Sequence, residues 1–249
     1  MSELSDKETL RYSRHLLLEE VGLEGQLALK SSTVAVVGAG GLGSPALLYL
    51  AAAGIGTLIL IDDDEVELSN LQRQVLYKIN HLGQSKVAAA GKVLASLNNQ
   101  INMVTDCQKL DESNATNILK SADIVLDCSD NFSTRYCVNR YCIANKTPLI
   151  SGAALATKGQ LMGFDFRQND SPCYGCVFPQ SEATPVINCS NAGVISPLLG
   201  VIGSMQAQLT LNLLLGYAEG CVFITFDALT LKQQHFKVIK DLECKECGK

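Results

Sequence analysis

Apolar and polar positions follow a repeating order through the first 150 residues of the chain. Short apolar runs, typical of strands buried on both faces of a parallel sheet, alternate with longer segments in which apolar residues recur at helical spacing. The predicted strands are 33–37, 57–61, 102–105 and 124–127. The predicted helices are 43–53, 86–97, 115–120 and 134–144. This alternation predicts a Rossmann-like α/β fold with a doubly wound, mostly parallel sheet.

The pattern changes in the second half of the chain. Residues 148–151 predict a further strand after the helix 134–144. The later apolar segments 159–165 and 222–226 lack the helical connections that parallel strands require, so we expect them to form an antiparallel extension of the sheet. Ser196 and Pro197 predict the N-cap and the first turn of a long apolar helix over 198–215.

The N-terminal segment carries its own helix signal. Ser5 and Glu8 form a Ser-x-x-Glu capping box, which predicts a helix from about residue 6 to residue 19. Arg11 and Arg14 share a face of that helix. From the pattern alone, a solvent-exposed face without a role is the favoured interpretation.

Size and composition favour one ordinary globular domain over residues 1–249. Hydrophobic residues make up 47% of the chain and charged residues 18%, and the net charge of -5 gives no general attraction to nucleic acid or anionic membranes. The first residues show no secretory signal, so we expect a cytoplasmic protein. Glycines and polar residues interrupt the two longest apolar stretches, which argues against membrane insertion.

A glycine-rich turn, Gly-Ala-Gly-Gly-Leu-Gly, connects the first predicted strand to the helix that follows it. Gly38 permits a tight turn, Gly40 lets backbone N–H groups approach a phosphate, and Gly43 lets helix and strand pack closely. The N-terminus of the helix then faces the anion. The turn therefore predicts a nucleotide site without naming the reaction.

Polar residues after the second strand indicate which kind of nucleotide the site binds. Asp62 ends that strand, 19 residues after Gly43, where a carboxylate accepts hydrogen bonds from ribose hydroxyls; taken alone, this indicates NAD. Arg73 and Lys86 follow, and two cations there suit the leaving pyrophosphate of a triphosphate. Two surface cations without a role are the alternative.

The segment that closes the strand at 124–127 contains a candidate magnesium ligand. Asp130 lies where the carboxyl edge of a parallel sheet binds ligands, and one carboxylate is enough when phosphate oxygens complete the shell of Mg²⁺. The alternative is that Asp130 caps the next helix.

Ten cysteines in a chain expected to be cytoplasmic favour metal ligation over disulfides. Two Cys-x-x-Cys pairs, 67 residues apart, fit a closed tetrahedral zinc site of structural type, with redox dithiols as the alternative. Its ligands would be Cys173, Cys176, Cys244 and Cys247. Cys189 is a candidate nucleophile or a free thiol. Five others are predicted to fill the core: Cys107, Cys128, Cys137, Cys142 and Cys221.

Taken together, the order and spacing of these motifs closely resemble the MoeB/ThiF family of ubiquitin-activating-like adenylyltransferases over nearly the whole chain. The motifs are Arg11-Tyr12-Ser13-Arg14, the turn from Gly38 to Gly43, Asp62, the run from Ser69 to Gln74, Lys86, the run from Asp127 to Asn131, Ser151-Gly152-Ala153, the two cysteine pairs and the run from Cys189 to Val194.

The resemblance implies adenylation by ATP of the C-terminal glycine of a ubiquitin-like sulfur carrier, of ThiS or MoaD type, with release of pyrophosphate. It implies that Asp130 holds Mg²⁺ and that the four paired cysteines hold Zn²⁺. The nucleotide-binding set it implies is Gly38, Gly40, Gly41, Gly43, Asp62, Ser69, Asn70, Leu71, Gln72, Arg73, Lys86, Asp130 and Asn131.

The resemblance also implies a homodimer in which Arg14 reaches the partner's ATP, which reverses the interpretation from the pattern alone. Cys189 would join the activated carrier through an acyl persulfide in ThiF-like members. Because the chain ends soon after Cys247, we expect sulfur from a separate donor such as a cysteine desulfurase or a rhodanese.

Within the single domain, the expected divisions are an N-terminal helical arm (1–30), a nucleotide-binding core (31–152), and a carrier-binding and zinc region (153–249). Two functions of other classes stay open at this point. They are an NAD-dependent oxidoreductase and a noncatalytic scaffold that binds a carrier.

Overall fold

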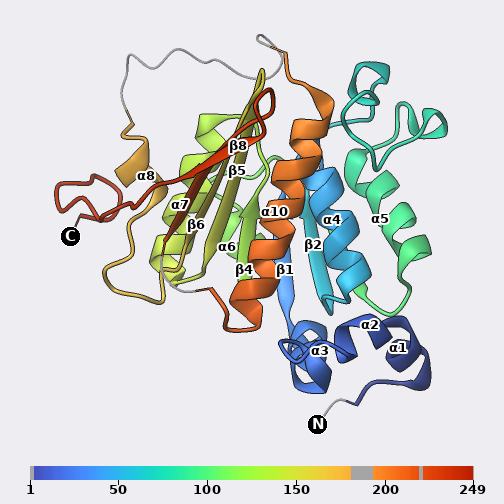
Figure 1. The fold of residues 1–249 in the computed structure, drawn as a ribbon. Coiled ribbons are helices and arrows are strands. Elements are labelled where there is room, and N and C mark those ends of the chain that lie inside the picture. The colour runs from blue at the N-terminus through green and yellow to red at the C-terminus, as the bar shows by residue number, and fades with distance from the viewer. Residues whose placement is uncertain (1–2, 181–192, 219–220, 249) are drawn as a thin grey trace.

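The computed structural model describes residues 3–180, 193–218 and 221–248. Within these ranges one sheet of eight strands runs in the order β3-β2-β1-β4-β5-β6-β7-β8 (Figure 1). Its strands are β1 (Thr33–Val37), β2 (Thr57–Ile61), β3 (Asn102–Asp106), β4 (Ile124–Asp127), β5 (Leu149–Leu155), β6 (Lys158–Phe164), β7 (Val222–Asp227) and β8 (Lys232–His235). The predicted Rossmann-like fold is confirmed.

Two layers of helices cover the sheet. The α-helices that we refer to below are α1 (Asp6–Arg11), α2 (Ser13–Leu16), α3 (Gly22–Ser31), α4 (Gly43–Ala53), α5 (Lys86–Leu97), α6 (Ala115–Leu119), α7 (Phe132–Asn145), α8 (Tyr174–Val177) and α10 (Ser196–Leu214). Two 3-10 turns, η1 (Leu68–Asn70) and η2 (Ile79–His81), lie between β2 and α5.

The parallel half of the sheet forms as the apolar runs predict. Strands β3, β2, β1, β4 and β5 pair in parallel, and the interior positions of β1, β2 and β4 are buried on both faces. Side chains of α4, α5 and α10 contribute to the core on one face, and those of α6 and α7 to the core on the other. The carboxyl ends of β1, β2 and β4 therefore meet at one edge.

The antiparallel half confirms the second expectation. β5 pairs with β6, β6 with β7, and β7 with β8, all antiparallel. Glycines in β6 let α10 approach the strand closely, because a Cβ at Gly159 would lie 2.6 Å from Ile202 and one at Gly163 would lie 2.8 Å from Leu209.

The N-terminal arm differs from its prediction. The Ser5 and Glu8 capping box is present, but the helix ends at Arg11, and Tyr12 separates α1 from α2. The Tyr12 side chain is buried: its hydroxyl accepts a 2.9 Å hydrogen bond from Asn98, and its ring lies against Gly54. This tertiary contact breaks the single helix that the local pattern predicts over 6–19.

The structure also tests the predicted cap of the long helix, the burial of five cysteines and the expected absence of a membrane-spanning helix. Ser196 is the first residue of α10 and not its cap; the N-cap is Ile195, which makes no side-chain cap hydrogen bond. Cys128, Cys137 and Cys142 are buried as predicted, whereas Cys107 is exposed and Cys221 is only half-buried. Across the described residues, no helix has both the length and the apolar character needed to cross a membrane.

Candidate functional site: a nucleotide cleft and a cysteine cluster

A cavity of about 560 Å³ opens at the carboxyl edge of the parallel strands. Its walls include the glycine-rich turn, the residues after β2 and β4, the first turn of α7, and the start of β6. Of the residues predicted to bind the nucleotide, eight line it: Gly38, Gly40, Gly41, Asp62, Arg73, Lys86, Asp130 and Asn131. The fold thus brings together positions that are far apart in the sequence.

The glycine-rich turn has the geometry that its sequence requires. Gly38 adopts φ +96°, in the region that favours glycine. A Cβ at Gly43 would lie 2.0 Å from the carbonyl oxygen of Gly38, so only glycine lets α4 start this close to the end of β1. Gly43 itself is buried and acts through this packing, whereas Gly40 and Gly41 face the cavity.

Asp62 is held at the end of β2 by the turn beside it. Its Oδ2 accepts a 2.7 Å hydrogen bond from the N–H of Ala39, and its Oδ1 accepts a 2.9 Å bond from the N–H of Asp64. Burial raises the pKa of the Asp62 carboxyl, while the Lys86 ammonium 3.9 Å away opposes that rise. The carboxylate is therefore fixed in direction with its edge toward the cavity.

The two cations predicted to bind phosphates, Lys86 and Arg73, line the same cavity as Asp62. Lys86, the first residue of α5, is 5% exposed and donates to Asp64 over 2.7 Å. Arg73 donates to the carbonyl of Ser69 over 2.9 Å and lines the cavity. A nearly buried ammonium beside an open cavity is placed to bind an anion, because it is desolvated already.

The neighbouring polar run lies outside the cavity lining. Ser69, Leu71 and Gln72 are not among the residues that line it, and the same holds for Asn70. Asn70 is buried, and its side-chain oxygen accepts a 3.3 Å hydrogen bond from the N–H of Glu67. Asn70 therefore shapes the turn that carries Arg73, and direct contacts of these four residues with a nucleotide stay a prediction.

The structure shows which of the two tasks considered for Asp130, metal ligand or helix cap, falls to its neighbour. Asn131 caps α7 through a 2.9 Å hydrogen bond from the N–H of Thr134 to its side-chain oxygen. The cap is thus not Asp130, whose carboxylate is exposed where it lines the cavity. This position suits a metal ligand that meets phosphate oxygens, and the magnesium assignment stays a prediction.

The sequence analysis missed a buried polar cluster under this loop. The guanidinium of Arg135, which is 7% exposed, pairs with Asp127 over 3.1 Å and donates to Ser151 over 2.9 Å. Burial alone would lower the pKa of Arg135, but the Asp127 carboxylate beside it raises the pKa overall. The available signal was an arginine directly before the apolar run 136–138 of the predicted helix.

The four paired cysteines converge as predicted. Their sulfur atoms all lie within 4.8 Å of one another, and three of the separations are 3.9 Å (Cys173 to Cys176), 3.7 Å (Cys173 to Cys244) and 3.4 Å (Cys176 to Cys247). Tetrahedral zinc with Zn–S bonds of about 2.3 Å separates its sulfur ligands by about 3.8 Å. The cluster therefore fits a structural zinc ion that fastens the C-terminal tail to α8.

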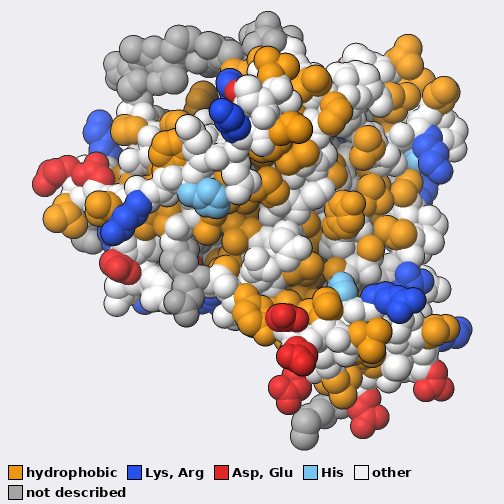
Figure 2. Space-filling view, viewed as in Figure 1, with side chains coloured by type: hydrophobic (Ala, Val, Ile, Leu, Met, Phe, Trp, Pro, Cys, Tyr) orange, Lys and Arg blue, Asp and Glu red, His pale blue; other side chains and the backbone are white. Residues whose placement is uncertain are grey.

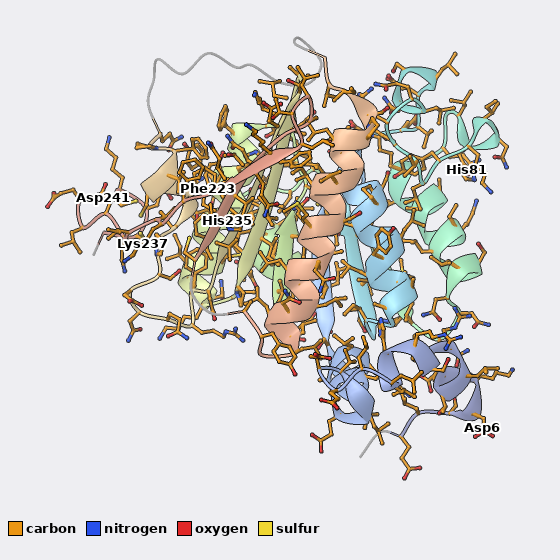
Figure 3. The ribbon with its side chains drawn as sticks, viewed as in Figure 1. Asp6, His81, Phe223, His235, Lys237 and Asp241 are labelled. Carbon is orange, nitrogen blue, oxygen red and sulfur yellow. The ribbon has the colours of Figure 1, made fainter. Side chains whose placement is uncertain are left out.

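One predicted catalytic residue, Arg14, is not among the residues that line the cavity. Arg14 is exposed on α2, in the arm at the end of the sheet opposite the cavity. Figure 3 shows Asp6 of this arm at the lower right of the molecule and His81, in the β2–α5 segment that carries Arg73, well above it at the upper right. Cys189 lies outside the described residues.

Comparison with known proteins identifies the family. The ThiF family profile matches residues 12–248. The chain belongs to the ThiF family. A molybdopterin-synthase adenylyltransferase of Salmonella typhimurium is 42% identical over 250 residues, which cover all of both chains, and one of Escherichia coli K12 is 42% identical over 251 residues with the same full coverage.

Other relatives of this ThiF family member are longer. An adenylyltransferase and sulfurtransferase MOCS3 of Aedes aegypti is 46% identical over 217 residues, which are 87% of this chain and 49% of that protein. The chain thus spans about half the length of the MOCS3 relatives it matches. The crystal structure of E. coli MccB with ATP has a TM-score of 0.82 at 24% identity, over 96% of this chain and 75% of that one, which shows the fold.

Proposed function

We propose that this ThiF family protein adenylates the C-terminal glycine of a ubiquitin-like sulfur carrier of the MoaD type, with ATP as the donor and pyrophosphate as the product. The full-length 42% identity to two molybdopterin-synthase adenylyltransferases carries this choice. The cleft supports it, since one cavity joins an anion-binding turn, two cations and an exposed carboxylate. The second candidate substrate is a ThiS-type carrier, which would place the protein in thiamine biosynthesis. This candidate rests on the motif resemblance alone.

In the proposed reaction, a carboxylate oxygen of the carrier attacks the α-phosphorus of ATP. A new P–O bond forms to the carrier as the bond between the α-phosphorus and the bridging oxygen breaks, and the electron pair leaves with pyrophosphate. No side chain has to transfer a proton, so catalysis consists of positioning and charge neutralisation.

The residues of the cleft have distinct proposed tasks. The turn at Gly40 and Gly41 lies against the phosphates, Asp62 accepts hydrogen bonds from the ribose, and Arg73 and Lys86 neutralise charge on the leaving pyrophosphate. Asp130 would hold Mg²⁺, which neutralises phosphate charge when it is bound. The exposure of Asp130 toward the cavity and the use of Asn131 as the helix cap leave its carboxylate available for this task.

The cavity also offers a path for the carrier tail. Ala153, Ala154 and Ala156 form part of its wall, with Lys158 and Phe178 beside them. Small side chains along a narrow wall suit a Gly-Gly terminus, which needs backbone contacts and has no side chains to place. We accordingly assign nucleotide binding to 31–152 and carrier binding, with the zinc cluster, to 153–249.

The alternatives make different predictions. An NAD-dependent oxidoreductase would use the glycine-rich turn and Asp62 but has no need for Arg73, Lys86 and Asp130 in the same cavity. A noncatalytic scaffold would bind a carrier without turnover. An acyl persulfide at Cys189 and sulfur supply by a cysteine desulfurase or rhodanese remain parts of the proposal that concern later steps.

The deciding experiment is intact-protein mass spectrometry of purified MoaD-type and ThiS-type carriers incubated with the enzyme, ATP and Mg²⁺. We expect the mass of the MoaD-type carrier to rise by one AMP. A carrier lacking its terminal glycine serves as the control and should stay unchanged. Binding of NAD together with no mass gain on either carrier would refute the proposed function in favour of the oxidoreductase, and carrier binding without AMP transfer would favour the scaffold.

We further propose a homodimer in which Arg14 of one copy completes the cleft of the other. Within one chain the arm and the cavity lie at opposite ends of the sheet, so Arg14 can reach a nucleotide only in a second copy. Figure 2 shows apolar side chains gathered over α10 and α4, where Tyr49 is 60% exposed and Val201 is 37% exposed. An apolar face of this kind suits a subunit interface.

Complementation tests the shared site. We expect Arg14→Ala and Lys86→Met each to lose adenylation by roughly 10- to 100-fold, because each removes a cation from the transition state. After the two inactive variants are unfolded together and refolded in equal amounts, half the dimers contain one intact cleft, so about a quarter of the unmutated activity should return. Recovery of no activity from a mixture shown to contain heterodimers would place Arg14 outside the partner's cleft.

A further inference from the structure

The Arg135 guanidinium lies directly beneath the loop that presents Asp130. Its four hydrogen bonds join three separate segments: it donates to Asp127 over 3.1 Å and to Ser151 over 2.9 Å through Nη1, and through Nη2 it donates to the carbonyl of Ser129 over 2.6 Å and to that of Gly152 over 2.9 Å. It belongs to α7, so one side chain ties α7 to the end of β4 and to the middle of β5.

Two of these bonds end at backbone carbonyls that adjoin the cavity. The Ser129 carbonyl belongs to the peptide group whose nitrogen is that of Asp130, so its direction fixes the plane from which the Asp130 side chain leaves. The Gly152 carbonyl immediately precedes Ala153, where the proposed wall for the carrier tail begins. One planar guanidinium thus sets the relative position of both sides of the cleft.

The other members of the cluster are buried and already hydrogen-bonded, so no neighbouring side chain can replace Arg135. Asp127 is 1% exposed, and its Oδ2 also accepts a 2.7 Å hydrogen bond from Ser151 while its Oδ1 accepts a 2.5 Å bond from Ser129. Gln206 of α10 donates to the carbonyl of Asp127 over 3.0 Å from the opposite face of the sheet. A fully connected network of this type specifies one arrangement of its members.

Arg135 also lies against Tyr174, a residue next to the cysteine cluster. Its guanidinium carbon lies 5.9 Å from the ring centre of Tyr174, which follows Cys173 directly and itself lines the cavity. The N–H of Tyr174 donates to the side chain of Asn139 over 3.0 Å, which holds α8 against α7. The segment between two of the candidate zinc ligands is therefore packed against the same guanidinium.

We propose that Arg135 is a positioning residue of the adenylation site, because it holds the Ser129 and Gly152 carbonyls at the distance that sets Asp130 opposite the tail-binding wall. The proposal rests on the proposed function. Arg135 itself lines the cavity, and in this role it acts through the backbone of the Asp127–Asp130 loop and of β5. Loss of this hold should slow the reaction more than it weakens nucleotide binding.

Arg135→Lys is the first test variant, since an ammonium keeps the charge near Asp127 but cannot make the same set of four bonds. We expect kcat for carrier adenylation to fall about 30-fold while the KM for ATP changes by less than about 3-fold. Arg167→Lys is the matched control, because it makes the same chemical change in a guanidinium that pairs with Asp165 over 2.7 Å and does not line the cavity. It should leave both parameters unchanged.

A double variant guards against misfolding from an unpaired buried carboxylate. Asp127→Asn with Arg135→Gln removes both charges together, and it should also lose kcat with little change in KM. Leu119→Ala in α6, where Leu119 is fully buried in the core, serves as a destabilised reference that leaves the cleft intact. If Arg135 acted only on global stability, Leu119→Ala would reproduce its kinetic defect, and the proposal would be wrong.

Hydrogen exchange separates this inference from the proposed function. In the nucleotide-free protein, we expect Arg135→Lys to raise exchange at the amides of 128–131 and 152–154 at least about 10-fold, with 33–37 unchanged. This readout needs no activity. If the unmutated protein adenylates no carrier, the proposed function fails on its own; if Arg135→Lys leaves both exchange and kcat as they were, the positioning role is refuted while the function stands.

Discussion

Asp130→Asn should reduce carrier adenylation by about 10³-fold, the largest catalytic effect that we expect for a single side chain of the cleft. The change keeps the size of the side chain but removes the charge that would hold Mg²⁺. Because Asp130 is exposed and Asn131 makes the helix cap, the fold does not depend on the carboxylate. Steady-state release of pyrophosphate, with the carrier present, measures the effect.

The matched control is Asp63→Asn, which removes another exposed carboxylate from the lining of the same cavity. It changes the local charge by the same amount but has no proposed contact with the phosphates, so its rate should stay within about 3-fold of the unmutated rate. The thermal midpoints of both variants should match that of the unmutated protein. Equal losses in the two variants would mean that general charge, and not a metal ligand at Asp130, controls the rate.

The features that the sequence predicted well are those set by local chemistry. The turn at Gly38 and Gly43 follows from a positive φ and from a Cβ clash that no other residue avoids, and both are properties of neighbouring positions. The parallel strands follow from short apolar runs with polar boundaries. The cysteine pairs carry their own ligand spacing, although the chain had to fold for Cys173 and Cys244 to come within 3.7 Å.

The features that the sequence did not predict depend on contacts between distant segments. Nothing near Tyr12 indicates that its hydroxyl meets Asn98, 86 residues later, yet this contact divides the N-terminal helix in two. Arg135 binds Asp127, Ser151 and the backbone of Gly152, and this set exists only once β4 and β5 lie side by side. Local patterns describe the ends of such contacts but not their pairing.

The cap of α7 shows how close residues exchange roles. Asp130 and Asn131 are both of residue types that cap helices, and the sequence analysis considered only Asp130 for this role. In the structure Asn131 has the extended backbone of a cap, with φ -134° and ψ 145°, and accepts the bond from Thr134. The position at which α7 begins therefore decides which of the two side chains caps the helix and which faces the cavity.

Removal of zinc should have the largest effect on stability. We expect the purified protein to carry about one zinc ion per chain, and chelation to lower the free energy of unfolding by on the order of 5 kcal/mol, because binding energy at a structural zinc site is folding energy. The reason lies in the tail: the surroundings of Cys244 and Cys247 are mostly exposed, with Ile239 at 74% and Leu242 at 76%. Few apolar contacts hold this segment when the metal is absent.

The partly buried ion pair between Arg140 of α7 and Glu246, at 3.3 Å, cannot replace the metal, because a single ion pair with a solvent-accessible guanidinium contributes only about 1 kcal/mol. Cys244→Ser should therefore reproduce the effect of chelation, whereas Cys107→Ser, at an exposed cysteine outside the cluster, should not. Three measurements test this prediction. Mass spectrometry gives the metal content, thermal melting gives the stability, and hydrogen exchange at 173–178 reports local loosening of α8. Because Tyr174 packs on Arg135, loosening of α8 should also slow adenylation. If the protein lost all its metal and its melting temperature did not change, zinc would not be a structural part of this fold.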